Sequence, residues 1–466
     1  MSIFTKKRPI EVRDSSRRDF IKYSVAVGAL LGLDRAKVFN VTERLAGTAI
    51  AGEMACATTN RSVHIIAGTG SFAWYNLLWP HNDIAQAHND QFAFHAPGME
   101  IVAQGSDKPL VFGPQAPWLA RGAKKFISAF MSGTNETHTA RPTSSSTIAT
   151  GTGLFATCAA IQAASPTLIP AIGVNMVPFG TAPGAPGLAT VADADGLVDL
   201  FNSAAARAMG TLAKPTDAGL YEAYYKAFVG LSAAAGKPTF QRGVTVGKAA
   251  ANLLGKNLAD QLRPSAADLA RYGVSGSSPT KILEIAKALI TTAKAFALGL
   301  TTSVILPVLN DDPHGAFNDM GSLMMTVTAL GKMLDSFMDD LMALDDPSCA
   351  GTKMGDNTVI SIHGDTPKDP LNRSGWPDGT PGNSNWCYCM GAGWLKTGWF
   401  GGVKRDGSVM GFDPTTGADA GGVSSAMTAQ SASAAIAYAV SKGDVRRVND
   451  FYRGADFGGL VRANQM

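Results

Sequence analysis

The sequence predicts an α/β fold built on a mostly parallel central sheet. Three short apolar segments rich in β-branched residues, at 62–67, 302–308 and 358–362, are typical of strands buried on both faces. Between the last two, residues 320–344 carry apolar side chains at alternating spacings of four and three, which predicts a long helix with one buried face. A strand, a long helix and a second strand in this order favour a parallel βαβ unit.

The other elements follow from the same spacings and from breaks at glycine and proline. The middle of the chain, at about 192–300, is rich in alanine at helical spacing, which predicts a helical insertion. The remaining expectations are helices at 118–130, 154–164, 281–300, 424–440 and 443–453, a buried strand at 167–174, and a glycine-rich loop at 391–422.

An export signal is predicted near the N-terminus. The segment Ser16-Arg17-Arg18-Asp19-Phe20-Ile21-Lys22 follows a basic leader and precedes an apolar run of eleven residues, 23–33. A membrane-spanning helix needs about 20 residues, so this run fits a receptor-read address better than an anchor. The segment resembles a twin-arginine (Tat) signal. That resemblance implies contact with the Tat translocase, export of the folded chain, and a periplasmic or secreted location.

The end of the leader has two interpretations. Ala55-Cys56-Ala57 offers a cleavage site of the A-x-A type, although it lies well beyond the apolar run. Residues 34–52 have apolar side chains at helical spacing and could form an amphipathic helix that stays on the chain. Cleavage near Ala57 is slightly favoured over retention. The expected organisation is a Tat signal and leader helix at 1–57, then a single α/β domain at 58–466 with the helical insertion at about 192–300.

The composition argues against two classes of partner. Charged residues make up 17% of the chain, below the roughly 25% of ordinary soluble domains, and 51 glycines indicate long loops. The net charge of +3 includes the basic leader, so the rest of the chain is close to neutral. No basic stripe follows the leader, which argues against a nucleic-acid partner. No later apolar run is long and uncharged enough to predict a stable membrane span.

The five cysteines permit a disulfide in an oxidising compartment. Loss of Cys56 with the leader would leave four. Cys387 and Cys389 are two residues apart, so in a strand both sulfurs would point to one face. A disulfide from one of them to Cys349 or Cys158, or simple burial, is expected ahead of a metal site, because no second cysteine or histidine pair accompanies them.

Two strand ends carry side chains of the kind that bind metal ions. Asp312 and His314 follow the second central strand, and His363 and Asp365 follow the third. In open α/β sheets, ligands bind beyond the carboxyl ends of parallel strands. Carboxylates and imidazoles are ligands for divalent zinc, manganese or calcium. The sequence therefore predicts a metal site formed by these four residues. The alternative is structural: an aspartate would cap a turn, and His363 would bond a loop carbonyl.

Several short motifs fall in a recognisable order around these residues. Asp312-Pro313-His314 comes first, then the long helix, then His363-Gly364-Asp365 and a glycine-rich stretch at 391–402, while Asn76 and Pro80 lie near the start. This order resembles a broad bacterial family of Tat-exported proteins of unknown function, related in fold to alkaline phosphatases and arylsulfatases. The resemblance covers about residues 62–175 and 300–405.

The resemblance implies a three-layer, alkaline-phosphatase-like sandwich and hydrolysis of a phosphate or sulfate ester beside a divalent metal. It implies that Thr137, a loop serine at 144–146 or a water attacks the ester, and that His138 contacts the anion or donates a proton. The chain departs from the family at Ala73, where an acidic residue is expected. An Asp-His-Gly segment is also missing between Trp376 and Gly391. A two-metal hydrolase needs about six ligands, so the site is expected to be degenerate.

The main alternative is a non-catalytic secreted binding or assembly protein on the same fold. An aromatic cluster would suit a carbohydrate or protein partner if exposed, or would pack the glycine-rich loops if buried. Its members are Trp376, Trp386, Trp394, Trp399 and Phe400. Convergence of the Asp312 and Asp365 loops would favour the hydrolase, with a small anionic ester as its ligand.

Two weaker patterns point to other chemistry. Residues 68–73 match the G-x-G-x-x-A pattern of dinucleotide-binding loops, but Pro80 would stop the helix that such a site needs. His81, His88 and His95 recur every seven residues, in a stretch whose asparagines and aspartates favour a hydrated loop over a metal-binding helix.

Overall fold

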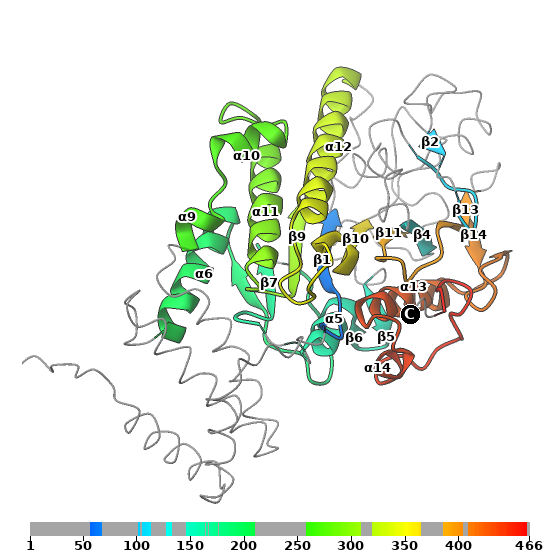
Figure 1. Ribbon diagram of the computed structural model, residues 1–466. Coiled ribbons are helices and arrows are strands. Elements are labelled where there is room, and N and C mark those ends of the chain that lie inside the picture. Colours follow the sequence, from blue (N-terminus) through cyan, green and yellow to red (C-terminus); the bar gives the residue numbers. More distant parts are fainter. Residues whose placement is uncertain are drawn as a thin grey trace, which may run out of the picture. The chain divides into compact units, whose positions relative to one another are not determined.

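The computed structural model describes residues 56–67, 101–102, 105–112, 127–132, 146–163, 165, 167–175, 177–209, 258–308, 319–364, 385–403 and 409–463. The chain divides into two compact units, residues 1–54 with 205–256, and residues 55–204 with 257–466. The second unit holds nearly all the described residues and is the one considered below. Its strands and helices form an α/β fold, as the sequence predicts (Figure 1).

A parallel trio of strands forms the centre of an eight-stranded sheet, whose order is β12-β4-β11-β10-β1-β9-β7-β8. Strand β1 (Arg61–Ala67) lies between β10 (Thr358–Gly364) and β9 (Ser303–Val308) and pairs in parallel with both. Val63 and Ile65 of β1 are fully buried. Apolar residues occupy both faces of these strands, because helices cover both faces of the sheet.

The flanking strands make the sheet mixed at one side only. Beyond β9, β7 (Ala171–Val174) and β8 (Ala189–Val191) continue the parallel pairing. Beyond β10, β11 (Asn385–Met390) runs antiparallel to both of its neighbours, β10 and β4 (Ile127–Ser132). The edge strand β12 (Gly398–Phe400) pairs in parallel with β4. The mostly parallel sheet is therefore confirmed, with β11 as the reversed strand among those described.

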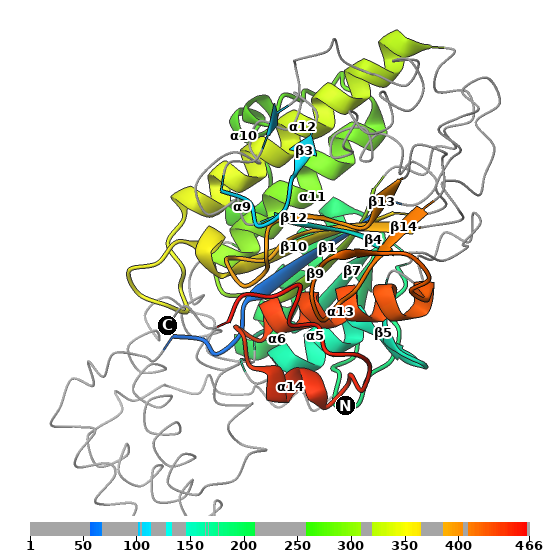
Figure 2. The ribbon, with the colours of Figure 1, turned by 90° about the vertical axis from the view of Figure 1, so that its right-hand side faces the viewer.

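Helices lie on both faces of this sheet (Figure 2). Helices α5 (Leu154–Gln162) and α13 (Ser425–Val440) cover one face. Helices α11 (Thr280–Ala297) and α12 (Met320–Ala343) cover the other. This arrangement is compatible with a three-layer sandwich. None of the described helices is both long and apolar enough to span a membrane.

Shorter elements complete the described chain. The helices are α6 (Ala194–Met209), α9 (Leu258–Leu262), α10 (Ala266–Arg271), α14 (Val445–Asn449) and the 3₁₀ turn η5 (Met354–Asn357). The small sheets are β2 (Ile101–Val102) with β3 (Val111–Phe112), β5 (Thr147–Ala149) with β6 (Thr152–Gly153), and β13 (Gly402–Val403) with β14 (Val409–Phe412) and β15 (Asp419–Ala420).

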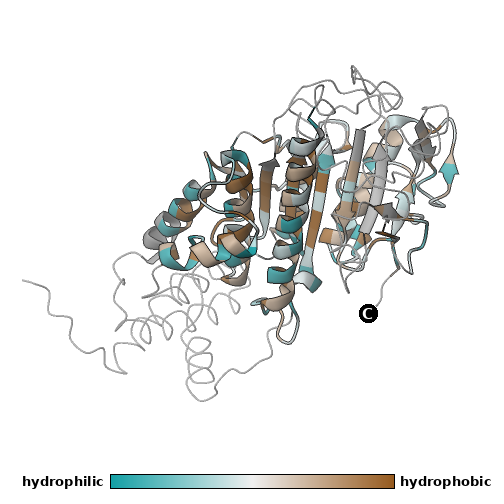
Figure 3. Ribbon diagram, turned by 90° about the horizontal axis from the view of Figure 1, so that it is seen from above, coloured by the Kyte–Doolittle hydropathy of each residue, from teal (hydrophilic) through white to brown (hydrophobic). Residues whose placement is uncertain are grey.

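Helix α12 confirms the long helix expected from apolar spacing. Its N-cap, Asp319, accepts a hydrogen bond from the backbone N–H of Ser322 at 3.0 Å. Most side chains of the predicted stripe are buried: Leu323, Val327, Leu330, Leu334, Phe337 and Leu341. The last one, Leu344, is half-buried. Figure 3 shows hydrophobic residues concentrated in the central strands, while the helices alternate between hydrophobic and hydrophilic residues. The stripe therefore faces the core.

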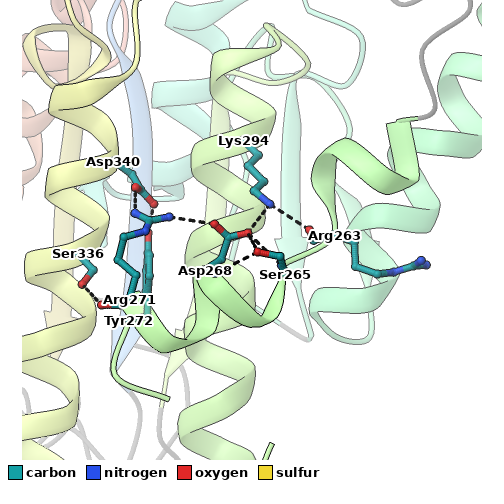
Figure 4. A network of polar contacts seen from close by, with 8 residues as sticks. All are labelled: Arg263, Ser265, Asp268, Arg271, Tyr272, Lys294, Ser336 and Asp340. Atoms are coloured by element: carbon teal, nitrogen blue, oxygen red, sulfur yellow. Dashed lines mark hydrogen bonds and ion pairs between the residues drawn. The ribbon is translucent and has the colours of Figure 1, made fainter. Parts of the chain in front are cut away.

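Charged and polar side chains join α10, α11 and α12 (Figure 4). Ser265 caps α10 in a capping box with Asp268, and Lys294 of α11 donates to the same carboxylate at 2.7 Å. Partial burial alone would raise the pKa of Asp268, but its bonds to Lys294 and Ser265 lower it below the usual range. On the other side of α10, Arg271 and the Tyr272 hydroxyl both donate to Asp340 of α12. The network fixes the short helix α10 against its two long neighbours.

Two expectations about secondary structure are wrong. Residues 127–130 belong to β4, within the range expected to be helical, because pairing with β11 on one side and β12 on the other decides the conformation. The tail expected to be a glycine-rich loop contains strands β12 to β15. Local apolar spacing does not reveal such pairing partners.

The cysteine pairing also differs from the expectation. Cys56 forms a disulfide with Cys349, 293 residues away in sequence. Cys158, Cys387 and Cys389 are free and buried, so the expected bridge from Cys387 or Cys389 to Cys349 or Cys158 is wrong. Burial raises the pKa of each of these three thiols, which keeps them protonated. Simple burial, the other expectation for Cys387 and Cys389, is what the structure has.

Candidate functional site

The three central strands end at the same level. Ala67, the last residue of β1, is the register partner of both Val308 in β9 and Gly364 in β10. Neighbouring strands lie about 4.8 Å apart, so the chain leaves β9 and β10 at points about 10 Å apart, one on each side of β1. The segments carrying the predicted ligands therefore start from one edge of the sheet.

Most of the predicted site residues lie outside the described residues. This holds for the metal ligands Asp312, His314 and Asp365 and for the catalytic residues Thr137 and His138. It also holds for residues 68–73 and for the three histidines at 81, 88 and 95. The described part of the site is the end of each central strand and the side chains packed beneath it.

His363 is the predicted ligand that the structure describes. Strand β10 continues to Gly364, two residues past its expected end, so His363 is a strand residue rather than a loop residue. Its side chain is fully buried, its Nε2 lies 2.7 Å from the Ser361 hydroxyl, and the Phe155 ring meets it edge-on at 5.0 Å. His363 therefore lies within the layer between the sheet and α5.

A second buried histidine shares the same hydroxyl. His64 of β1 is the register partner of Ser361, and its Nδ1 lies 2.7 Å from the Ser361 Oγ. The His64 ring also packs on Phe155, with centroids 4.7 Å apart. Sequence reasoning missed His64 and Ser361, because each occupies an inward position of an apolar strand. A polar residue at such a position was the signal that could have found them.

The shared hydroxyl couples the protonation of the two histidines. A serine hydroxyl donates one hydrogen bond and can accept another. Because the hydroxyl has a single hydrogen, it can donate to only one of the two rings, so at least one of His64 and His363 donates its N–H to the Ser361 oxygen. Burial, and then the neighbouring His363, lower the pKa of His64 well below its usual value. His64 is thus neutral at physiological pH.

Cysteines extend this layer along the sheet. Cys389 is the register partner of Ser361, and Cys387 is the partner of His363, so these side chains share one face. Cys158 of α5 belongs to the same hydrophobic cluster. Even so, no group of three or more His, Cys, Asp or Glu side chains in the described segments has the arrangement needed to hold a metal ion. Together these side chains form one buried layer of histidines, a serine and cysteines between the sheet and helices α5 and α13.

Helix α5 begins over the His64 and His363 rings, because Phe155 is its second residue. Two backbone N–H groups of its first turn already have partners: Leu154 donates to the Ser146 carbonyl at 2.6 Å, and Ala156 donates to the Phe179 carbonyl at 3.2 Å. A small cavity of about 230 Å³ lies beside this turn, lined by residues such as Gly151 and Gly180. These two N–H groups at the start of α5 are therefore hydrogen-bonded to the protein's own backbone.

A larger hollow lies at the opposite, amino-terminal edge of the central strands. Its volume is about 620 Å³, and its lining includes Asp107, Lys396, Tyr438, Phe457 and Arg462. Arg462 Nη2 donates to the Asp107 carboxylate at 2.8 Å, so opposite charges pair within the wall. The lining of the hollow therefore carries aromatic rings together with both acidic and basic side chains.

The aromatic cluster of the glycine-rich tail is mostly internal where it is described. Trp399 and Phe400 are 7% and 1% exposed, so for these two residues the packing alternative holds rather than the binding face. Trp394 packs against Tyr438, with ring centroids 6.3 Å apart. These rings pack the tail against α13 rather than offering a face to a partner.

A scan against protein-family models and searches of curated proteins and of solved structures find no match to this chain.

Proposed function

We propose that this protein is exported and carries a degenerate site of the phosphate or sulfate ester hydrolase type, with fewer metal ligands than a two-metal hydrolase has, at the carboxyl edge of β9, β1 and β10. One observation supports this most: Ala67 pairs with both Val308 and Gly364, so the segments bearing Asp312, His314 and Asp365 start from one edge. Asp365 follows Gly364 directly, and Asp312 follows Val308 by four residues. Such an edge is the usual ligand site of open α/β sheets.

The donor chemistry suits a divalent zinc, manganese or calcium ion. Asp312, His314 and Asp365 supply hard and borderline donors. Such an ion would polarise an anionic ester oxygen. His363 fits a supporting role better than a ligand role, because its Nε2 bonds Ser361 inside the core. The fold resemblance also favours an alkaline-phosphatase-like sandwich, which the two helical layers support.

In this proposal the reacting side chains come from the segment before β5. The Thr137 hydroxyl loses its proton to solvent and attacks the phosphorus or sulfur atom, the bond from that atom to the ester oxygen breaks, and protonated His138 gives the leaving oxygen a proton. Water then releases the acid from Thr137. Both assignments rest on the family resemblance described above.

Export is supported by two independent features. The twin-arginine segment at 16–22 resembles a Tat signal. The Cys56–Cys349 disulfide suits an oxidising compartment such as the periplasm or the exterior, since cytosolic thiols are kept reduced.

A non-catalytic binding or assembly protein is the second candidate. The missing Asp-His-Gly segment favours it, and so does the 620 Å³ hollow at the opposite edge, whose aromatic and charged lining would suit a small carbohydrate.

Metal content and ester hydrolysis of the exported protein decide between the two. We expect near-stoichiometric zinc, manganese or calcium, and hydrolysis of p-nitrophenyl phosphate or sulfate. Both should be lost in an Asp312→Asn, Asp365→Asn double variant and kept in Asp450→Asn, which changes the exposed C-cap residue of α14. A folded, metal-free protein that hydrolyses neither ester would overturn the hydrolase and leave the binding protein.

A further inference from the structure

Residues 56–61, which lead into β1 and include its first residue, are hydrogen-bonded to other parts of the fold. We call them the entry segment. The Ala57 N–H donates to the Ser348 carbonyl at 3.1 Å, and Arg447 donates to the carbonyl and the hydroxyl of Thr58. Asn60 donates from its backbone to the Val440 carbonyl at 2.8 Å and from its side chain to the Ala439 carbonyl, also at 2.8 Å.

The entry segment ends in a buried ion pair and begins in a disulfide. Arg61 Nη2 lies 2.8 Å from the Asp346 carboxylate and donates to the Ser348 hydroxyl at 3.2 Å. Cys56 is bonded to Cys349, one residue beyond Ser348. The segment is thus held from both ends against residues 346–349, the connection that follows α12.

Cleavage after Ala57, at the A-x-A site expected from the sequence, conflicts with these contacts. It would remove Cys56 and leave Cys349 as a thiol, and it would make Thr58 a charged N-terminus beside Arg447. The Tat route exports folded chains, so a leader peptidase would meet Ala57 already bonded to Ser348. Proteases cut exposed and mobile segments in preference to hydrogen-bonded ones.

We infer that leader processing hydrolyses a peptide bond upstream of Cys56, so that the mature protein keeps Cys56 and the disulfide. This inference rests on the proposed export. The sequence offers a second tripeptide of the A-x-A type at Ala49-Ile50-Ala51, closer to the apolar run of the signal. Cleavage there would leave Gly52 as the first residue.

The test is N-terminal sequencing and intact mass of the protein exported with its own leader, with thiols alkylated before and after reduction. We expect a first residue upstream of Ala57, Gly52 in particular. In denaturant, which exposes the three buried thiols, three cysteines should be alkylated before reduction and five after it, because Cys56 and Cys349 are masked by the disulfide. A first residue at Thr58 or later, with Cys349 alkylated before reduction, would overturn the inference.

Two substitutions locate the cleaved bond independently of the wild-type measurement. A phenylalanine at the position before the cut blocks leader peptidases, which require small residues there. Ala57→Phe should leave the first residue unchanged, whereas Ala51→Phe should block or shift cleavage. The reverse result would also overturn the inference. A chain that stays inside the cell with its leader intact would instead contradict the proposed export, so the two failures are distinguishable.

Discussion

Arg61 Nη2 and Asp346 Oδ1 lie 2.8 Å apart, with only 7% and 0% of the two side chains exposed. Burial alone would raise the pKa of Asp346, but Arg61 and the hydroxyl and backbone N–H of Ser348 lower it below its usual value. The pair joins the first residue of β1 to the connection between α12 and β10.

Replacing Arg61 by methionine should destabilise the protein by about 3–5 kcal/mol, because the buried Asp346 carboxylate loses its counter-ion. Urea unfolding followed by circular dichroism measures this. Arg446→Met is the matched control, since Arg446 pairs with Asp444 in solvent, and it should change the free energy of unfolding little. Adding Asp346→Leu to Arg61→Met should recover much of the loss, and a double variant as unstable as the single one would contradict the argument.

Removal of the disulfide should lower stability by about 2–5 kcal/mol, because it closes a very long loop in the unfolded chain. A Cys56→Ala, Cys349→Ala double variant should match the reduced wild type in thermal and urea unfolding. Reducing agent should then have no further effect on the variant. If reduction leaves wild-type stability unchanged, the disulfide does not stabilise the native fold.

Ser361→Ala removes the hydroxyl shared by two buried imidazoles and should cost about 2–4 kcal/mol. The comparison is Ser322→Ala, an exposed serine in the first turn of α12, which should be close to wild type. Denaturant unfolding compares the three proteins. Ser361→Ala with wild-type stability would show that neither histidine needs this hydroxyl.

His64 should make the protein sensitive to mild acid. Its pKa is lowered in the folded state, so below about pH 6.5 the unfolded chain binds a proton that the folded chain cannot. Stability should therefore fall as pH drops from about 6.5, by up to about 1.4 kcal/mol per pH unit. In His64→Gln this slope should be smaller between pH 6.5 and 5. An identical pH profile in the two proteins would contradict the burial of a neutral His64.

Asp268→Asn should cost about 1–2 kcal/mol at pH 7, because it weakens the bonds that the Asp268 carboxylate accepts from the backbone N–H and hydroxyl of Ser265 and from Lys294. The pKa of Asp268 is lowered in the folded state, so its contribution is present above about pH 4 and is lost as pH falls further. The gap between wild type and variant in urea unfolding should therefore narrow below pH 4. Asp450→Asn should show neither effect.

Sequence reasoning located the elements with strong local patterns. The strand expected at 62–67 is β1 within one residue, and the helix expected at 320–344 is α12 within one residue at its end. The strand and the helix each have a regular pattern of apolar residues. Strand β4 was missed because the apolar residues of 127–132 suit a helix as well as a strand, and β11 decides the outcome.

The candidate site was predictable only in outline. The common level at which β9 and β10 end beside β1 followed from the sequence once the strands were taken as parallel. The placement of Asp312 and Asp365 at that edge stays a prediction, because both lie outside the described residues. The contact of His64 with Ser361 was not predictable, since it depends on the register of two strands whose residues are 297 positions apart. The pairing of Cys56 with Cys349 was unpredictable for the same reason, because no local pattern encodes a contact across most of the chain.

The central place of β1 delays the completion of folding. Ser62 meets Ser303 across 241 residues, and His64 meets Ser361 across 297. Pairings this distant in sequence form slowly and only after most of the polypeptide has been synthesised. Until residue 364 has left the ribosome, β1 lacks a neighbour on one side and presents an open strand edge that other chains can pair with. The nascent protein should therefore depend on chaperones for most of its translation.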